Sequence, residues 1–418
     1  MRAVGLMKYG LIGERLGHSF SKDIHGMLAD YSYELKEISR EALENFLTER
    51  SFKAINVTIP YKETVIPYLY YIDDAAKKIG AVNTVVNRDG RLYGYNTDFY
   101  GLRALILHLG ISLEGKKVVI LGTGGTSKTA MAVADSLGAR EIIRVSRSER
   151  CDAVTYTQMY ESHGDADMII NTTPRGMYPN CYDKAADLSR FDKLLGVVDA
   201  VYNPLRSSLI RDARSLGIRA EGGLYMLVAQ AVRASEIFLD TSYADGEIDK
   251  IYRDILGQKE NIVLVGMPAS GKSTVGKIIA DKLGRSFIDT DDLIVKRAKI
   301  SIPEIFERYG EEYFRELEAL AVRDAGANGN SVIATGGGAV LREENIDALR
   351  ANGRLYFIDR PLCDLVPTDS RPLSSDREAI EKRYNERYGI YCSVCDCHIK
   401  VTTDAEGVAA HIMENFRK

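Results

Sequence analysis

The sequence has few cysteines and no surplus of positive charge. Six cysteines in 418 residues do not form a disulfide framework, and without an export signal we expect reduced thiols in a cytoplasmic protein. The formal net charge is −4, whereas a protein that binds nucleic acid usually carries a basic surplus. Small anionic ligands remain compatible with this balance, because local basic clusters can bind them.

Long apolar runs and repeats are also absent. No stretch of about 18 apolar residues predicts a transmembrane helix, and the first residues lack the features of a signal peptide. We therefore expect no membrane contact. Fixed-period repeats and low-complexity tracts are missing too. A globular chain of this length predicts two to four domains, at ~100–200 residues each.

Short apolar runs alternate with longer helical patterns along the chain, which is typical of α/β folds with parallel sheets. Predicted strands include those that end at Gly122, Asn171, Tyr202 and Gly266. The helical stretch 224–256, interrupted around 241–246, precedes the clearest domain boundary, at 257–260. A softer boundary is expected near residue 97, before the glycine-rich strand at 117–125.

The strongest motif is Gly266–Ser273, the sequence GMPASGKS, which follows a predicted strand and opens a helix. This is the Walker A pattern in its required context. Its glycines let backbone N–H groups surround phosphate oxygens, and the helix N-terminus favours negative charge. Lys272 would bridge the terminal phosphates of ATP, and Ser273 would bind Mg²⁺. The predicted ATP-binding residues of this loop are Gly266, Ala269, Gly271, Lys272, Ser273 and Thr274.

Further polar motifs follow in the same half. Asp289 and Asp291 end the next strand, where ligands of α/β folds bind, although a helix N-cap with an acidic neighbour is the alternative. A triple glycine after a strand allows the backbone to approach a ligand closely. Arginines can hold a carboxylate through the guanidinium fork, although each alone can equally be a solvated charge. The glycines are Gly336, Gly337 and Gly338, and the arginines are Arg315, Arg371 and Arg387.

Residues 261–418 resemble shikimate kinase. The resemblance rests on the order of six motifs, namely Walker A, DTD, FR, GGG, RPL and NER. The resemblance implies a P-loop domain with a parallel sheet that phosphorylates shikimate with ATP and Mg²⁺. The catalytic residues it implies are Asp291, Lys272 and Arg371, the last also binding ATP. It assigns Mg²⁺ to Ser273 and Asp289. It assigns the substrate to Asp291, Arg315, Gly336, Gly337, Gly338 and Arg387.

In the first half, Gly122–Ser127 follows the strand KVVIL and precedes a helical pattern. This is a variant of the dinucleotide-binding loop, and a purely structural glycine turn is the alternative. The next strand ends in Ser146 and Arg147 rather than in an acid, which favours the 2′-phosphate of NADP unless Arg147 is a solvated charge. The predicted NADP-binding residues are Gly122, Gly124, Gly125, Thr126, Ser127, Ser146 and Arg147.

The first 98 residues contain the motifs HSFS, NVTIPYKE, AVNT and NTD. A hydride delivered to a ketone leaves an alkoxide, which needs a proton. Lys62 paired with Asp98 can supply it, since a charge-assisted hydrogen bond would hold both in place. In isolation, Lys62 would be an exposed lysine and Asp98 a helix cap.

These motifs, the glycine loop and the stretch MLVAQ resemble shikimate dehydrogenase over about residues 8–256. The resemblance implies NADPH-dependent reduction of 3-dehydroshikimate to shikimate, with Lys62 and Asp98 as the catalytic pair. It implies a mixed α/β substrate-binding domain at 1–97, completed by about 224–256, and a Rossmann-like NADP-binding domain at 98–223. The implied substrate-binding residues are Ser19, Ser21, Thr58, Lys62, Asn83, Asp98, Tyr202 and Gln230.

Some positions depart from these families. Lys22 and Gly26 replace a usual proline and asparagine in the dehydrogenase motif. Tyr225 replaces a common glycine and is expected to narrow the nicotinamide side of the cleft. In the kinase, the segment 359–371 is shorter than usual and lacks the arginine that packs on adenine, which leaves the choice of nucleotide base open.

Two further patterns are interpreted as packing. Cys392, Cys395, Cys397 and His398 are spaced like zinc ligands, but the last two fall on a predicted strand, where alternate side chains face opposite ways. The aromatic run 68–71 has no basic stripe beside it and is expected to pack rather than to stack on nucleobases.

Both halves act on shikimate if the resemblances hold, which favours one bifunctional enzyme with small-molecule substrates. The main alternative is an active kinase fused to a silent or regulatory dehydrogenase-like module. Intact Lys62, Asp98 and loop glycines count against that alternative. A second alternative is a preference for quinate or NAD. The sequence leaves a homodimer open.

Overall fold

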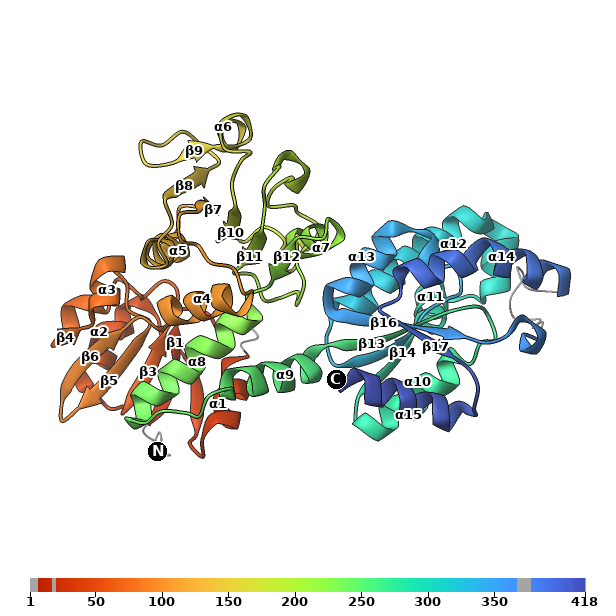
Figure 1. Ribbon diagram of the computed structural model, residues 1–418. Coiled ribbons are helices and arrows are strands. Elements are labelled where there is room, and N and C mark those ends of the chain that lie inside the picture. Colours follow the sequence, from red (N-terminus) through yellow and green to blue (C-terminus); the bar gives the residue numbers. More distant parts are fainter. Residues whose placement is uncertain (1–6, 17–19, 367–376, 418) are drawn as a thin grey trace. The chain divides into compact units, whose positions relative to one another are not determined.

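The chain forms two compact units, Met1–Ile255 and Leu256–Lys418. The computed structural model describes residues 7–16, 20–366 and 377–417 (Figure 1). Both units are α/β structures built on parallel or mixed sheets, so the predicted fold class is confirmed. Within the described ranges, no helix is long and apolar enough to cross a membrane.

The first sheet of unit 1 is mixed, with the strand order β2-β1-β3-β5-β6-β4. Strand β1 runs parallel to β2 and β3, whereas β5 is antiparallel to β3 and β6. The strands are β1 (Tyr9–Gly13), β2 (Tyr33–Glu37), β3 (Ala54–Val57), β4 (Tyr71–Ile72), β5 (Thr84–Arg88) and β6 (Arg91–Tyr95). Their helices are α1 (Ser21–Leu28), α2 (Arg40–Glu49), α3 (Asp74–Ile79) and the short η1 (Ile66–Tyr68).

The second sheet of unit 1 is entirely parallel, in the order β12-β11-β10-β7-β8-β9. The strands are β7 (Lys117–Leu121), β8 (Glu141–Ser146), β9 (Val154–Thr155), β10 (Met168–Asn171), β11 (Gly196–Asp199) and β12 (Arg219–Glu221). Helices α5 (Gly125–Ser136), α6 (Tyr156–Ser162), η2 (Leu188–Arg190) and α7 (Ser208–Ser215) connect them. Val118 and Ile120 of β7 face one core and Val119 and Leu121 the other, as expected for a strand covered on both faces.

Strand β11 ends before the predicted strand does. The sequence predicts a strand that reaches Tyr202, but pairing stops at Asp199. The Asp199 carboxylate accepts hydrogen bonds from the Val201 N–H (3.0 Å) and from the Ser207 hydroxyl (2.5 Å). Because the side chain competes with the sheet for backbone donors, the chain turns at this point.

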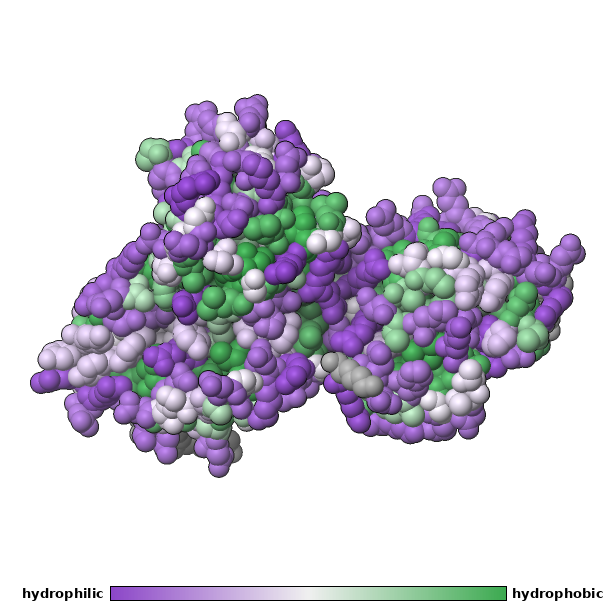
Figure 2. Space-filling model, viewed as in Figure 1, coloured by the Kyte–Doolittle hydropathy of each residue, from purple (hydrophilic) through white to green (hydrophobic). Residues whose placement is uncertain are grey.

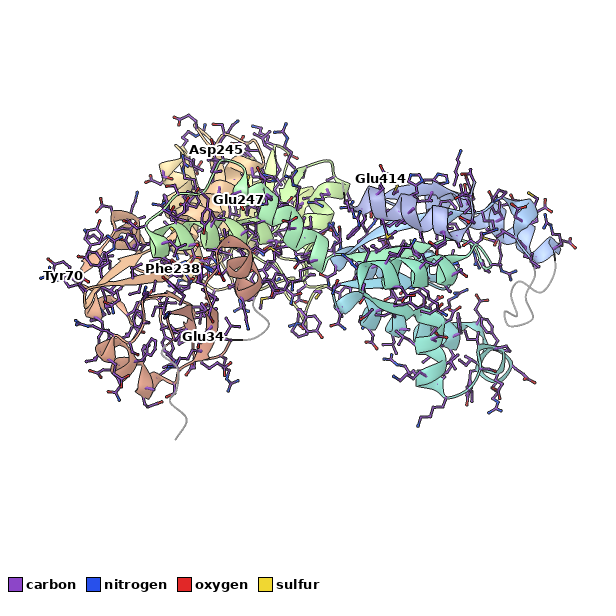
Figure 3. All side chains as sticks on the ribbon, turned by 90° about the horizontal axis from the view of Figure 1, so that it is seen from below. Glu34, Tyr70, Phe238, Asp245, Glu247 and Glu414 are labelled. Atoms are coloured by element: carbon purple, nitrogen blue, oxygen red, sulfur yellow. The ribbon has the colours of Figure 1, made fainter. Side chains whose placement is uncertain are left out.

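Two helices flank the parallel sheet of unit 1 in the sequence, one before its first strand and one after its last. They are α4 (Thr97–His108) and α8 (Leu224–Leu239), which pack along each other. The approach is closest at Gly101, where an added Cβ would lie 2.6 Å from the Met226 carbonyl oxygen and 3.1 Å from Gln230 Cβ. A further helix, α9 (Glu247–Lys259), begins near the labelled Asp245 and Glu247 in Figure 3, so the predicted break at 241–246 is confirmed.

Unit 2 contains a five-stranded parallel sheet in the order β14-β15-β13-β16-β17. The strands are β13 (Asn261–Val265), β14 (Ser286–Asp289), β15 (Ser331–Ala334), β16 (Gly353–Asp359) and β17 (Cys397–Lys400). Its helices are α10 (Lys272–Leu283), α11 (Thr290–Ala298), α12 (Ile302–Ala327), η3 (Ala339–Leu341), α13 (Glu343–Asn352), η4 (Leu362–Asp364), α14 (Arg377–Val394) and α15 (Ala405–Phe416). Alternate residues of β13 again face two cores. On the face shown in Figure 2, the surface of each unit is mostly hydrophilic with scattered apolar patches.

In the aromatic run 68–71, the rings of Tyr70 and Tyr71 both pack on Tyr93, but at the surface, where both side chains are exposed. The Tyr70 side chain is 64% exposed and points away from the ribbon (Figure 3). Strand β4 lies at the edge of its sheet, so side chains beside it have fewer neighbours to cover them. The Arg91 guanidinium lies over the Tyr70 ring, 4.6 Å from its centre.

We predict that Gly101→Ala destabilises unit 1. The added methyl group would overlap the Met226 carbonyl, so α4 and α8 must separate, at a cost of about 1–3 kcal/mol. Chemical unfolding followed by fluorescence would measure the loss. The matched control is Gly26→Ala in α1, where a Cβ meets nothing within 4 Å and the free energy of unfolding should stay the same or rise. Equal stability of the two variants would contradict the tight α4–α8 contact.

Candidate active sites

A pocket of about 200 Å³ in unit 1 collects residues from the first sheet, from segments that follow strands of the parallel sheet, and from α8. Most of the residues predicted to bind the dehydrogenase substrate line it, namely Ser21, Thr58, Lys62, Asn83, Asp98, Tyr202 and Gln230. Ser19 lies outside the described residues. Thr126, predicted to bind NADP, also lines this pocket and brings the glycine loop to its edge.

Lys62 and Asp98 form an ion pair in this pocket, with 2.6 Å between Lys62 Nζ and Asp98 Oδ2. Their side chains are only 27% and 14% exposed. Asp98 lies in the first turn of α4, whose N-cap is Asn96, so Asp98 is not needed as a cap. The pair therefore presents an ammonium proton to the pocket, held in place by a charge-assisted hydrogen bond.

Asn83 and Gln230 are positioned by a buried network. The Asn83 amide donates to Gln230 Oε1 at 3.2 Å, and its oxygen accepts from the Thr97 N–H at 2.7 Å. The Thr84 hydroxyl also donates to Asn83 Oδ1. Both amide side chains are thus fixed in orientation, with α4 and α8 as supports.

The sequence analysis missed His25 and Asn56, which also line this pocket. The His25 ring stacks on Tyr33 with 3.9 Å between centres, and its Nδ1 lies 2.5 Å from the Tyr31 hydroxyl. Burial lowers the pKa of His25 to about 3, so the imidazole is neutral at physiological pH. Asn56 could have been found, because it belongs to the NVT motif at the end of β3.

The expected role of Tyr225 beside the nicotinamide is wrong. Its ring stacks on His108 with 4.0 Å between centres, and its hydroxyl donates to Asp249 at 2.8 Å. The α8 residues that line the pocket follow helical spacing from Met226 to Gln230, and Tyr225 lies off that face. Lys22 is exposed on α1 and is not among the lining residues.

A second pocket of about 400 Å³ lies at the carboxyl edge of the parallel sheet in unit 1. The predicted NADP residues Gly122, Gly124, Ser146 and Arg147 line it. Gly122 has φ +109°, and a Cβ there would lie 2.8 Å from Thr172 Oγ1, so only glycine leaves room at this turn. Gly125 and Ser127 lie in the first turn of α5 and do not line the pocket. The buried Ser127 hydroxyl instead donates to the Gly124 carbonyl.

Three arginines face this second pocket: Arg147, Arg150 and Arg175. Arg150 pairs with Asp152, whereas Arg175 lies over the Tyr156 ring, 5.9 Å from its centre. The arginines, the open turn at Gly122 and the helix start at Gly125 fit a phosphorylated dinucleotide. Arg150 and Arg175 were missed by the sequence analysis, although Arg175 follows the end of β10, where ligands of parallel sheets bind.

In unit 2, the residues of the Walker A motif form a loop between β13 and α10. Gly266, Ala269 and Gly271 have φ values of +148°, +63° and +96°. Lys272 and Ser273 start α10, followed by Thr274. The Lys272 ammonium donates to the carbonyls of Gly266 and Met267 at 3.0 and 2.8 Å, which folds it over the loop.

The Ser273 hydroxyl donates to Asp289 Oδ2 at 2.7 Å, and the other Asp289 oxygen accepts from the Asp291 N–H. The N-cap alternative is thus correct for Asp289, and its second oxygen is still directed at the loop. A hydroxyl and a carboxylate in contact are the hard oxygen ligands that suit Mg²⁺. The residues present therefore fit the predicted ion.

The predicted kinase substrate residues also lie together. Cβ positions at Gly336 and Gly338 would touch Asp291 and Arg315, and Arg387 donates to the Gly337 carbonyl at 3.2 Å. The sequence analysis missed Glu318, which accepts from the Arg315 guanidinium at 2.7 Å. Burial raises the pKa of Glu318 against the opposing effect of Arg315. Its spacing of three residues from Arg315 on α12 was the available signal. Arg371 lies outside the described residues.

The cysteine-rich segment has other contacts. His398 Nε2 lies 2.8 Å from Asp359 Oδ2, and the Cys395 thiol contacts the Cys392 carbonyl. Within the described ranges, no three His, Cys, Asp or Glu side chains are grouped to hold a metal ion.

Comparison with known proteins gives matches in both units. Residues 268–417 match the shikimate kinase family, and residues 11–85 match the shikimate dehydrogenase substrate-binding domain. The shikimate dehydrogenase (NADP(+)) of Clostridium beijerinckii is 37% identical over 247 residues, which are 55% of this chain and 91% of that protein. The chain belongs to the shikimate dehydrogenase family. It is a fusion, because a shikimate kinase domain follows, and we call the two parts the dehydrogenase unit (unit 1) and the kinase unit (unit 2).

Solved structures agree with the dehydrogenase assignment. Shikimate dehydrogenase 1 of Peptoclostridium difficile is 35% identical, covers 60% of this chain and 97% of its own, and has a TM-score of 0.54. A chorismate mutase/shikimate 5-dehydrogenase fusion from Clostridium acetobutylicum is 33% identical over 60% of this chain and 98% of its own, with a TM-score of 0.57. The Thermus thermophilus enzyme, solved with NADP(H) and shikimate, is 26% identical over 59% and 99%, with a TM-score of 0.53.

Asp199 does not line the pocket of the dehydrogenase unit but holds the backbone turn next to it. It is fully buried and also accepts from the Asn171 amide at 2.9 Å, so it fixes the turn that carries Tyr202 into the pocket. Burial raises the pKa of Asp199 to about 7, and hydrogen bonds from Ser207, Val201 and Asn171 oppose this rise.

We predict that Asp199 makes the stability of the dehydrogenase unit depend on pH. Because its folded pKa is raised above the unfolded value of 3.8, its contribution is complete below about pH 4 and is lost as the pH rises through about 7. The slope should be at most about 1.4 kcal/mol per pH unit. Urea unfolding between pH 5 and 8 would show this slope, and Asp199→Asn should remove it. The same slope in both proteins would exclude Asp199 as its source.

Proposed function

We propose that this chain catalyses two consecutive reactions, reduction of 3-dehydroshikimate to shikimate with NADPH and phosphorylation of shikimate to shikimate 3-phosphate with ATP. The observation that carries the first reaction is the Lys62–Asp98 ion pair in a pocket beside an arginine-lined dinucleotide site. The kinase match and the contacts among Ser273, Asp289 and Asp291 support the second. No finding favours a silent dehydrogenase module.

In the dehydrogenase unit, NADPH would supply the hydride when bound. Lys62 Nζ would donate a proton to the carbonyl oxygen as that oxygen gains negative charge, with Asp98 holding the ammonium in line. Ser21, Thr58, Asn83, Tyr202 and Gln230 would hold the carboxylate and hydroxyl groups of the substrate, because all face the same pocket. The Asn83–Gln230 hydrogen bond keeps two of these groups from rotating.

In the kinase unit, MgATP would supply the phosphoryl group when bound. The loop backbone and Lys272 would hold the phosphates, and Ser273 and Asp289 would serve the ion. Asp291 would orient the shikimate hydroxyl and accept its proton. Arg315, Arg387 and the backbone at Gly336–Gly338 would bind the rest of the substrate.

The proposal includes a cytoplasmic location, supported by six cysteines that are all free in the structure. The partners are small molecules. The homodimer and the roles assigned to Ser19 and Arg371 remain predictions.

We predict that the two activities can be removed separately. Purified protein given 3-dehydroshikimate, NADPH, ATP and Mg²⁺ should consume NADPH and form shikimate 3-phosphate, followed by absorbance and mass. Lys62→Ala should lower NADPH consumption about 10²–10⁴-fold, since it removes the proton donor, while added shikimate is still phosphorylated. Lys272→Ala should remove phosphorylation and spare the reduction.

Matched controls are available for both lysines. Lys78 forms an exposed ion pair with Asp135, and Lys282 forms one with Glu406 at the far end of α10. Lys78→Ala and Lys282→Ala should leave both activities unchanged. Loss of both activities in a folded Lys62→Ala or Lys272→Ala protein would overturn the proposal of two independent sites. Wild-type protein that phosphorylates shikimate without oxidising NADPH would restore the regulatory-module alternative.

We predict that Arg147→Asp shifts cofactor preference from NADPH toward NADH. The substitution replaces a guanidinium in the second pocket with a carboxylate that repels the 2′-phosphate and accepts from a 2′-hydroxyl. The kcat/KM for NADPH divided by that for NADH should fall by about two orders of magnitude, because a charge-assisted contact is lost and a repulsion is added. Arg140→Asp, at the opposite end of β8, is the control. An unchanged ratio would show that Arg147 does not read the 2′-phosphate.

A further inference from the structure

The end of β16 touches the phosphate loop of the kinase unit. Strand β16 pairs with β13, with Phe357 opposite Val265. A Cβ at Gly266, the first loop residue, would lie 2.7 Å from the Ile358 carbonyl oxygen. The residue that follows the strand, Arg360, therefore leaves the sheet directly beside the loop.

The Arg360 side chain lies along this loop. Its Nε donates to the Ser270 carbonyl at 3.3 Å, and one terminal guanidinium nitrogen is 3.5 Å from the Cβ position of Gly271. Ser270 and Gly271 immediately precede Lys272. The half-buried Arg360 guanidinium is thus a second cation, beside Lys272, that lies against the backbone expected to surround the phosphates.

Among the described residues, the charge of Arg360 has no carboxylate partner. Its hydrogen bond there goes to a backbone carbonyl rather than to an acid. The adjacent Asp359 is engaged elsewhere, by His398 Nε2 at 2.8 Å and by the Tyr388 hydroxyl at 3.3 Å. A partly buried guanidinium without a counter-charge is stabilised when an anion binds next to it.

We propose that Arg360 binds the phosphate chain of the nucleotide, which rests on the proposed kinase function and adds a residue to its site. The guanidinium reaches the loop at residues 270–271, whose backbone belongs to the phosphate cradle, and this favours a phosphate over the base. A guanidinium can bind two phosphate oxygens at once and thereby fixes the chain in one orientation. Arg360 is then a specificity residue for polyphosphates.

The test uses the full-length protein and the variants Arg360→Gln, which removes the charge at similar length, and Arg360→Lys, which keeps it. The KM for ATP, the KM for shikimate, kcat and the inhibition constant of inorganic tripolyphosphate, which lacks a base, would be measured for each. Dehydrogenase activity reports that the protein is intact. The matched control is Arg297→Ala. Arg297 lies in the last turn of α11 and forms an ion pair with Asp324.

Arg360→Gln should raise the KM for ATP and the inhibition constant of tripolyphosphate by the same factor, about tenfold, as for loss of a charged hydrogen bond. The KM for shikimate should stay unchanged, and Arg360→Lys should restore part of the affinity. Unchanged constants for both phosphates would overturn the proposal. So would an effect on ATP alone, which would place Arg360 at the base. Wild-type protein that does not bind ATP at all would instead refute the kinase function.

Discussion

The carboxyl ends of parallel strands meet at one edge of a sheet, and the candidate sites depend on this constraint. In the dehydrogenase unit, β7 leads to Gly122, β8 to Arg147 and β10 to Thr172, and all three residues line one pocket. In the kinase unit, β13 leads to the phosphate loop and β14 to Asp289, which contacts Ser273 of that loop. The sheet topology alone therefore brings residues that are far apart in sequence within hydrogen-bonding distance.

The substrate pocket of the dehydrogenase unit needs a second constraint, because its sheet is mixed. Lys62 follows β3, but its partner Asp98 is on α4, and Gln230 is on α8. These elements converge only because α4 and α8 pack so closely that Gly101 leaves no room for a side chain. The geometry of the ion pair is therefore set by helix packing as much as by the sheet.

The sequence predicts well where chemistry is tied to a local backbone pattern. The α/β fold class and the break before α9 are confirmed, since hydrophobic periodicity encodes them. The dehydrogenase–kinase fusion, predicted from the resemblance of the motifs to two families, is confirmed as well. Sequence analysis does not find single functional residues that belong to no local pattern. His25 lies on a helix, and only the folded chain shows that it faces the pocket. The spacing of Glu318 from Arg315 allows their contact, but only the folded chain shows that the pair is buried. The prediction for Tyr225 was wrong because neighbouring residues of a helix point in directions about 100° apart, so Tyr225 faces His108 while Met226 faces the pocket.

The two arginines assigned to the carboxylate of shikimate are not equivalent. Arg315 is already neutralised by Glu318 at 2.7 Å and Glu311 at 2.9 Å. Arg387 is buried, donates to the Gly337 carbonyl and forms no ion pair within the described ranges. A substrate carboxylate at Arg315 would have to compete with two acids, whereas at Arg387 it would supply a missing counter-charge. In the proposed kinase site we therefore expect Arg387 to be the principal ligand of the substrate carboxylate, with Arg315, held in place by its two acids, as a second donor.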